Sequence, residues 1–298
     1  MSRASVIATT GSVLTTVAQR VEGAAFLDGP ADLLARAWAP LARRSRSLLS
    51  GSWLGHPLHP ALVAGPLGFF SAATAMDALG QPEAARKLVG AGLLASGPTA
   101  LTGLSDWLDT SGAERRVGLA HLALNSLAVG LYAASYRRRR AGRQPSGMAL
   151  AGAGAAVMGA SAWLGGHLAY GLGVGVDTNA FSAGAVDWTE VEGRPAEDGS
   201  PMPTSVGSTA LVASRQGDRV CVLADRCSHR GGPLSEGTVR GGTINCPWHG
   251  SRFDLATGKV VSGPAVVAQP VYEAEEVAGR LRVRRNEQRT LRTNPARP

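Results

Sequence analysis

Four long apolar stretches dominate the first part of the chain. They cover residues 61–80, 88–108, 117–136 and 148–168, and short polar connectors separate them. Each is close to the about 20 residues that a helix needs to cross a bilayer, and none shows the polar face at helical spacing that a soluble helix carries. Their many small residues suit close helix contacts in lipid. The pattern predicts a four-helix transmembrane bundle within residues 51–175, rather than the buried helices of a soluble bundle.

A mixed segment precedes the bundle. Residues 30–50 alternate Leu34, Trp38 and Leu48 with arginines, which is typical of a helix that lies along a membrane surface; a soluble helix is the alternative. The first twenty residues lack the basic start and unbroken apolar core of a secretory signal. We therefore predict an N-terminal interfacial segment over residues 1–50.

The character of the chain changes after the fourth apolar stretch. Residues 176–185 form a glycine-containing linker, and from Val186 short alternating runs such as "STALVAS" and "RLRVRR" stand between turn residues. Such runs predict strands. We expect an all-β domain over residues 186–285 and a loose tail over residues 286–298. The predicted fold is α+β with two domains, and no internal repeat is evident in the sequence.

Charge and cysteine content narrow the class of protein. The formal net charge is +8, and lysine occurs only at Lys87 and Lys259. The arginines cluster at the edges of the apolar segments, which favours charges that flank membrane spans over a nucleic-acid surface. Three cysteines are too few for a disulfide framework. We therefore expect membrane lipid, and no nucleic acid, among the partners.

Two matched pairs of metal-binding residues stand out in the β region. Cys227 and His229 are two positions apart, Cys246 and His249 are three apart, and sixteen residues separate the pairs. Each pair follows a short predicted strand, so the two loops could together bind one metal centre. Two sulfur and two nitrogen ligands suit zinc or an iron–sulfur centre. Glycines flank both pairs, which lets backbone approach closely there.

The motif C-x-H-x16-C-x2-H, written here as "CSHRGGPL" and "CPWHGSRFD", resembles the Rieske family over residues 186–285. The resemblance implies a small antiparallel β-sandwich with a 2Fe–2S cluster at its tip. Cys227 and Cys246 would hold the buried iron, and His229 and His249 the outer iron. The "SGPA" at 262–265 is similar to the proline-containing third loop that helps to cover the cluster in that family. A structural zinc ion is the alternative.

The sequence departs from the respiratory members of that family. Gly232 and Trp248 stand where those proteins carry a disulfide, and Phe253 stands where high-potential members place a tyrosine, although Ser251 matches their serine. Fewer hydrogen bonds to the cluster mean a less stabilised reduced state. We expect a reduction potential between the ferredoxin-like and respiratory types, and we interpret Cys221 as a small core residue.

Four further histidines lie outside the β domain. Tracing the four crossings places His56, His59, His121 and His167 at one face of the membrane, the face from which the β domain follows. The histidines could simply favour the interface. The alternative is a polar site that holds haem b through two imidazoles, a metal ion or a quinone. The segments "GHPLHP" and "GGHLAYGLGVGV" resemble an uncharacterised bacterial four-helix membrane family with an HPxHP signature, which implies a fold but no chemistry.

These features together predict a membrane-bound one-electron transfer protein that exchanges electrons with redox proteins or quinone. A Rieske oxygenase is disfavoured because no histidine follows His249 to hold a mononuclear iron. The alternatives are a quinol- or haem-linked oxidoreductase, and a Rieske ferredoxin on a non-redox anchor. We expect a multi-pass protein of the bacterial cell membrane. The absent disulfide favours the cytoplasmic face for the β domain, although the loop charges lean weakly the other way.

Overall fold

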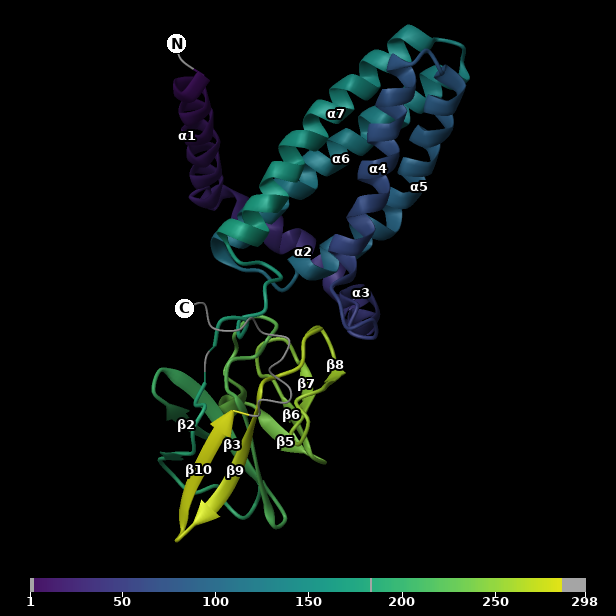
Figure 1. Ribbon diagram of the computed structural model, residues 1–298. Helices are drawn as coiled ribbons and strands as arrows, with labels where there is room; N and C mark the ends of the chain where they lie inside the picture. The colour runs from purple at the N-terminus through teal and green to yellow at the C-terminus, as the bar shows by residue number, and fades with distance from the viewer. Residues whose placement is uncertain (1–2, 183, 286–298) are drawn as a thin grey trace. The chain divides into compact units, whose positions relative to one another are not determined.

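The computed structural model describes residues 3–182 and 184–285, which separate into two compact units (Figure 1). The first unit comprises residues 58–174 and the described residues up to Ser45. The second comprises residues 46–57 and the described residues from Gly175 onward. The first unit is helical. The second is built from strands, apart from the short helix α3 (Arg46–Ser50) and a 3-10 turn at Leu234–Glu236. The predicted two-domain α+β fold is confirmed, and the predicted tail at 286–298 lies outside the described residues.

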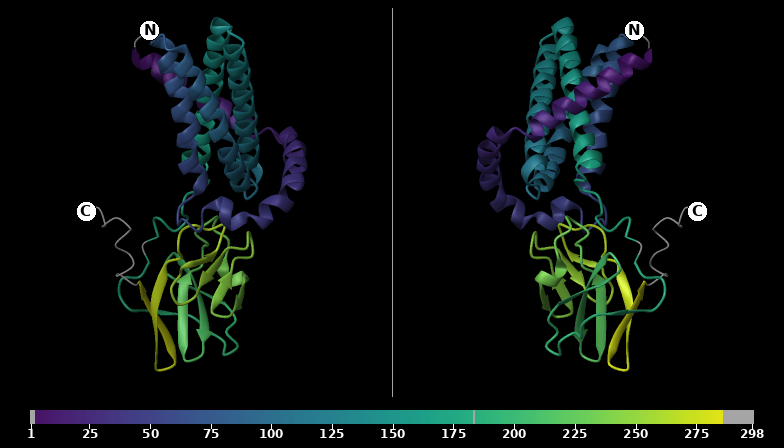
Figure 2. Two further views of the ribbon diagram at one scale, coloured as in Figure 1. Left: turned by 90° about the vertical axis from the view of Figure 1, so that its right-hand side faces the viewer. Right: turned by 90° about the vertical axis from the view of Figure 1, so that its left-hand side faces the viewer.

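Four helices of the first unit are long and apolar enough to cross a membrane. They are α4 (Leu58–Ala78), α5 (Pro82–Trp107), α6 (Gly112–Arg140) and α7 (Gln144–Gly166), and α7 continues into a π-helical turn at His167–Gly171. Figure 2 shows them side by side in both views. The α4–α5 and α6–α7 connectors turn at Gly80 and Gly142, whose φ angles of 69° and 74° favour glycine. The predicted four-helix bundle is therefore confirmed.

The bundle core contains buried residues from all four of these helices. Phe70 stacks on Tyr132 with ring centroids 3.7 Å apart and planes at 5°, and Val89 packs against the same cluster. At the C-terminal ends of α4 and α6, Asp77 accepts hydrogen bonds from both terminal nitrogens of Arg139 at 2.7 and 2.5 Å. The Arg139 side chain is 0% exposed, so a charged residue is accommodated here only because it is fully paired.

Two N-terminal helices, α1 (Arg3–Glu22) and α2 (Asp28–Arg44), contact the bundle through polar side chains. Asp28 accepts two hydrogen bonds from Arg116 of α6, at 2.7 and 2.6 Å. Glu22 pairs with His167 at 2.7 Å. These contacts hold the helices to α6 and to the end of α7. The predicted placement of this segment along a membrane surface stays a prediction.

The second unit contains two antiparallel sheets. The larger has the strand order β1-β10-β9-β4-β3-β2 and the smaller has the order β5-β6-β7-β8. The larger sheet comprises β1 (Thr189–Val191), β2 (Met202–Val206), β3 (Thr209–Gln216), β4 (Arg219–Ala224), β9 (Val271–Val277) and β10 (Arg280–Arg285). The smaller comprises β5 (Thr238–Arg240), β6 (Thr243–Asn245), β7 (Arg252–Asp254) and β8 (Val260–Ser262).

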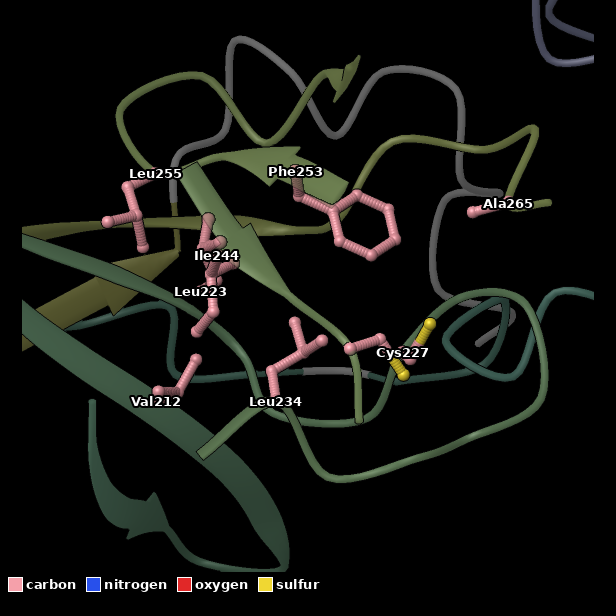
Figure 3. Packing of buried hydrophobic residues seen from close by; sticks show 9 residues of the cluster. Val212, Leu223, Cys227, Leu234, Ile244, Phe253, Leu255 and Ala265 are labelled. Atoms are coloured by element: carbon pink, nitrogen blue, oxygen red, sulfur yellow. The ribbon is translucent and has the colours of Figure 1, made fainter. Parts of the chain in front are cut away.

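One hydrophobic core is shared by the two sheets (Figure 3). Val212 and Leu223 come from the larger sheet, and Ile244 and Phe253 come from the smaller. Both Cys227 and Cys246 belong to this cluster, each 1% exposed. Cys221 packs against it as a partly buried residue, in agreement with its interpretation as a core residue. The two predicted ligand loops therefore begin from the buried core of the unit.

Candidate metal centre

The two predicted ligand loops have the same local geometry. Cys227 follows β4 and Cys246 follows β6. Four residues after each cysteine the loop turns at a glycine, Gly231 or Gly250, with a φ of about 75°. The N–H of Gly231 donates to the carbonyl of Cys227 at 2.8 Å, and the N–H of Gly250 donates to the carbonyl of Cys246 at 3.1 Å. Because only glycine adopts this φ without strain, the glycines noted in the sequence set both turns.

The two thiols lie together in a shell of backbone donors. Cys227 and Cys246 share a hydrogen bond through their sulfur atoms. The N–H groups of His229 and Arg230 point to the Cys227 sulfur, and those of Trp248 and His249 point to the Cys246 sulfur. Donation from Cys227 lowers the pKa of Cys246 to about 6, and the same bond together with burial raises the pKa of Cys227. Such donors stabilise thiolate charge.

The two imidazoles lie next to each other, with the edge of one ring toward the face of the other. The ring centroids of His229 and His249 are 5.2 Å apart, with the planes at 88°. Burial lowers the pKa of His229 to about 3 and that of His249 to about 4, and the positive charges of Arg46 and Arg230 act in the same direction. Both rings are therefore neutral at neutral pH, the form that offers a nitrogen lone pair to a metal.

Three residues compared above with the respiratory members, Gly232, Ser251 and Phe253, lie close to or beneath the ligand loops. A Cβ atom on Gly232 would lie 2.9 Å from the Trp248 ring and 3.0 Å from the Cys246 sulfur, so no side chain has room there. Ser251 is 0% exposed, and its Oγ accepts a hydrogen bond from the N–H of Ala265 at 3.0 Å. Its own hydroxyl proton remains to be donated. Phe253 is fully buried in the core, so the position of the expected tyrosine holds no polar group.

Gln269 fastens the first ligand loop and was missed by sequence reasoning. Its Nε2 donates to the carbonyls of Ala224 and Arg226, both at 2.7 Å. Its Oε1 accepts the N–H of Ser228 at 2.8 Å. The side chain is 2% exposed, so one glutamine amide satisfies three backbone groups around Cys227. No local pattern distinguishes it from an ordinary loop residue.

A segment from far upstream contacts the second ligand loop, and sequence reasoning also missed it. We call residues 46–52 the N-terminal strap; they belong to the second unit. Nη1 of Arg46 donates to the carbonyl of His249 at 2.8 Å. The Ser47 hydroxyl accepts the N–H of Gly263 at 3.2 Å and lies 3.3 Å from the Ser262 hydroxyl. The strap thus ties the second ligand loop to the predicted third loop.

The donor set fits a binuclear centre. A single zinc ion needs four ligands that converge on one point. Among the residues that the structure describes, no group of three or more His, Cys, Asp or Glu side chains is arranged to hold one ion. Two thiols that meet each other, and two neutral imidazoles that meet each other, instead suit a centre in which two irons divide the ligands.

The four histidines predicted for the second site have different hydrogen-bond partners. His59 donates from Nδ1 to the carbonyl of Thr99 at 3.0 Å, and His121 does so to Ser161 at 2.8 Å. These two rings lie within electrostatic range of each other. His167 pairs with Glu22. His56 belongs to the second unit, is exposed, and contacts the carbonyl of its neighbour Pro57 at 3.0 Å. The interactions therefore separate His59 and His121 from the other two.

Comparison with known proteins assigns both regions. The family model "Rieske [2Fe-2S] domain" matches residues 189–273, and "Predicted membrane protein (DUF2231)" matches residues 55–178. Ferredoxin CarAc of Metapseudomonas resinovorans is 40% identical over 78 residues, which are 26% of this chain and 73% of that protein. The anthranilate 1,2-dioxygenase ferredoxin subunit of Burkholderia cepacia is 33% identical over 83 residues, 28% of this chain and 77% of that protein. The solved ferredoxin of carbazole 1,9a-dioxygenase from Nocardioides aromaticivorans IC177 is 26% identical, with a TM-score of 0.31, and the match covers 33% of this chain and 98% of that one.

Proposed function

The chain belongs to the Rieske [2Fe-2S] family through its C-terminal domain, and on that premise we propose that it carries single electrons at a membrane through a cluster held by Cys227, Cys246, His229 and His249. The observation that carries the proposal is the arrangement of the four side chains. Two buried thiols meet each other, and two neutral imidazoles lie edge to face with their ring centroids 5.2 Å apart. Each of the two loops contributes one cysteine and one histidine.

Each ligand has a distinct role in this proposal. When bound, a 2Fe–2S cluster supplies a couple that takes up or releases one electron. Cys227 and Cys246 would hold the inner iron as thiolates, whose charge the backbone donors of both loops balance. His229 and His249 would hold the outer iron. The histidines are less buried than the cysteines, so the imidazole side is where a redox partner can exchange electrons.

The surroundings of the ligands support a potential between the ferredoxin-like and respiratory types. The hydroxyl proton of Ser251 is not used in its hydrogen bond with Ala265, and its donation to a bound cluster would stabilise the reduced state. Phe253 offers no second hydroxyl. One such donor in place of two leaves less stabilisation of the added negative charge.

We propose redox proteins or quinone as the electron donor and acceptor. The Burkholderia cepacia relative is by its name the ferredoxin subunit of a dioxygenase. In the present chain the domain is joined to four candidate membrane spans, so a membrane-bound partner is within reach as well as a soluble one. We place the Rieske domain on the cytoplasmic face because the chain lacks the disulfide of the respiratory type.

A second cofactor site in the membrane domain is part of the proposal, with haem b ranked first, then quinone, then another metal ion. It is supported by His59 and His121, whose Nδ1 atoms are both held by backbone carbonyls. With such a site the protein is a haem- or quinol-linked oxidoreductase in one chain; without it the bundle anchors a Rieske ferredoxin.

Spectroscopy of the purified full-length protein tests the cluster. Optical and EPR spectra before and after dithionite should show a Rieske centre, and analysis should find iron and inorganic sulfide. Cys227→Ser should abolish these signals. Cys221→Ser is the matched control, because Cys221 lies in β4 and outside the ligand set, and it should retain them. Protein that contains zinc but no iron or sulfide, made with an intact maturation pathway, would overturn the proposal.

A further inference from the structure

The membrane bundle contains an internal repeat in which residue i corresponds to residue i+62. Contacts in the structure reveal it. The corresponding positions are His59 and His121, Phe70 and Tyr132, Asp77 and Arg139, Gly92 and Gly154, Thr99 and Ser161, and Gly103 and Gly165. In every pair the offset is the same 62 positions. The first repeat is the hairpin α4–α5 and the second is α6–α7, and the two turn glycines, Gly80 and Gly142, also correspond.

Corresponding histidines make the same contacts. On α4, His59 donates from Nδ1 to the carbonyl of Thr99 on α5. A Cβ atom on Gly103 would lie 2.6 Å from the His59 ring. On α6, His121 repeats the hydrogen bond to its own hairpin partner. A Cβ atom on Gly165 would lie 3.0 Å from the His121 ring. Each imidazole is therefore locked in the same way, against a glycine of the neighbouring helix.

The aromatic residues repeat the pattern and locate the symmetry axis. Phe70 lies against Gly92 just as Tyr132 lies against Gly154. In addition, Phe70 stacks on Tyr132. A residue that touches its own repeat equivalent must lie near the two-fold axis that relates the repeats. Asp77 pairs with Arg139 and is a second such contact. The axis therefore runs between α4 and α6. Because both hairpins cross in the same direction, it runs along the membrane normal.

His59 and His121 are thus a symmetric pair on either side of this axis, within electrostatic range of each other. A carbonyl can only accept, so Nδ1 carries the proton in both rings and Nε2 carries the lone pair. At present Nε2 of His121 accepts from Asn125 at 3.0 Å. Metal-ligating histidines are commonly held in this way, with the second ring nitrogen bonded to a carbonyl. The residues that correspond to His56 and His167 are Gly118 and Ser105. Of the four histidines predicted for the second site, only His59 and His121 therefore have a histidine at the corresponding position of the other repeat.

We propose that His59 and His121 are the two axial ligands of one haem iron, bound between the repeats. The inference deepens the proposed function by naming the ligands and the class of the second cofactor. Among the described residues no third His, Cys, Asp or Glu is grouped with the two histidines. A bare ion would therefore find only two of its ligands in the protein. A haem brings four ring nitrogens of its own and needs only two from the protein.

The test uses full-length protein from cells supplied with a haem precursor. The purified protein should show the visible bands of a low-spin haem on dithionite reduction, and pyridine haemochrome should recover stoichiometric haem. His59→Ala and His121→Ala should each lower haem content to background, with equal effect because the sites are equivalent. His56→Ala and His167→Ala are matched controls and should retain haem. Loss in a control as complete as in His59→Ala would overturn the pairing.

A cavity variant guards against loss of haem through misfolding. In His59→Gly, free imidazole can enter the vacated position and should restore the low-spin spectrum; lack of rescue in both His59→Gly and His121→Gly would count against direct ligation. The EPR signal of the Rieske cluster separates this inference from the proposed function. An intact cluster signal with no haem overturns the haem site alone, whereas loss of the cluster in wild-type protein overturns the proposed function.

Discussion

The charge of Arg46 should raise the reduction potential of the cluster. Nη1 of Arg46 is 2.8 Å from the carbonyl of His249, so the guanidinium lies beside the second ligand loop. A cluster becomes more negative when it accepts an electron, and a nearby positive charge stabilises that state. For a separation of about 8 Å and an effective dielectric constant of about 20 to 80, one unit charge contributes roughly 0.5–2 kcal/mol, or about 20–90 mV for one electron.

Arg46→Gln should therefore lower the potential by tens of millivolts, measured by an EPR-monitored redox titration at low ionic strength. Arg46→Lys keeps the charge and should recover most of the shift. Arg219→Gln removes the same charge at the exposed start of β4, far along that strand from Cys227, and should leave the potential nearly unchanged. A drop in Arg46→Lys as large as that in Arg46→Gln would show that packing, and not charge, is responsible; no drop in either would refute the reasoning.

Four further substitutions probe the loops and the repeat. Ser251→Ala removes the buried hydroxyl and should lower the potential in the same titration, so an unchanged value would argue against its hydrogen bond to the cluster. Gln269→Leu leaves three backbone groups near Cys227 without their partner; it should cost roughly 2–4 kcal/mol in chemical denaturation, and a wild-type midpoint would contradict this role. Asp77→Arg and Arg139→Asp should each destabilise the bundle by roughly 3–5 kcal/mol. The double exchange should restore much of the thermal stability, and additive losses would show that the pair is not a direct contact.

Features encoded by neighbouring residues could be predicted from the sequence. The four spans follow from uninterrupted apolar stretches, and the β domain follows from alternation between turns. The spacing of Cys227, His229, Cys246 and His249 marks a cluster motif because each pair sits within a single turn. The N-terminal strap is different. Its contacts join residues more than 200 positions apart, and its own composition indicates only a short arginine-bearing helix.

The repeat escaped the sequence reading although short traces of it are present. "HPAL" at 59–62 corresponds to "HLAL" at 121–124, and "LVGAG" at 88–92 corresponds to "LAGAG" at 150–154. Glycine, alanine and leucine are common in every membrane helix, so these matches carry little weight alone. The informative pairs are not identical residues: Phe70 and Tyr132 are both aromatic, and Asp77 and Arg139 carry opposite charges. Only the contacts within these pairs reveal that their members correspond.

The position of each pair relative to the axis explains which pairs diverged. A residue on a two-fold axis meets its own copy, so a perfect duplication would set two aspartates or two arginines against each other where water is scarce, at a large electrostatic cost. Asp77 and Arg139 therefore had to differ, whereas aromatic rings such as Phe70 and Tyr132 can meet their own kind. A residue placed to the side of the axis has no such conflict. His59 and His121 have remained identical, as expected if both approach one shared ligand from opposite sides.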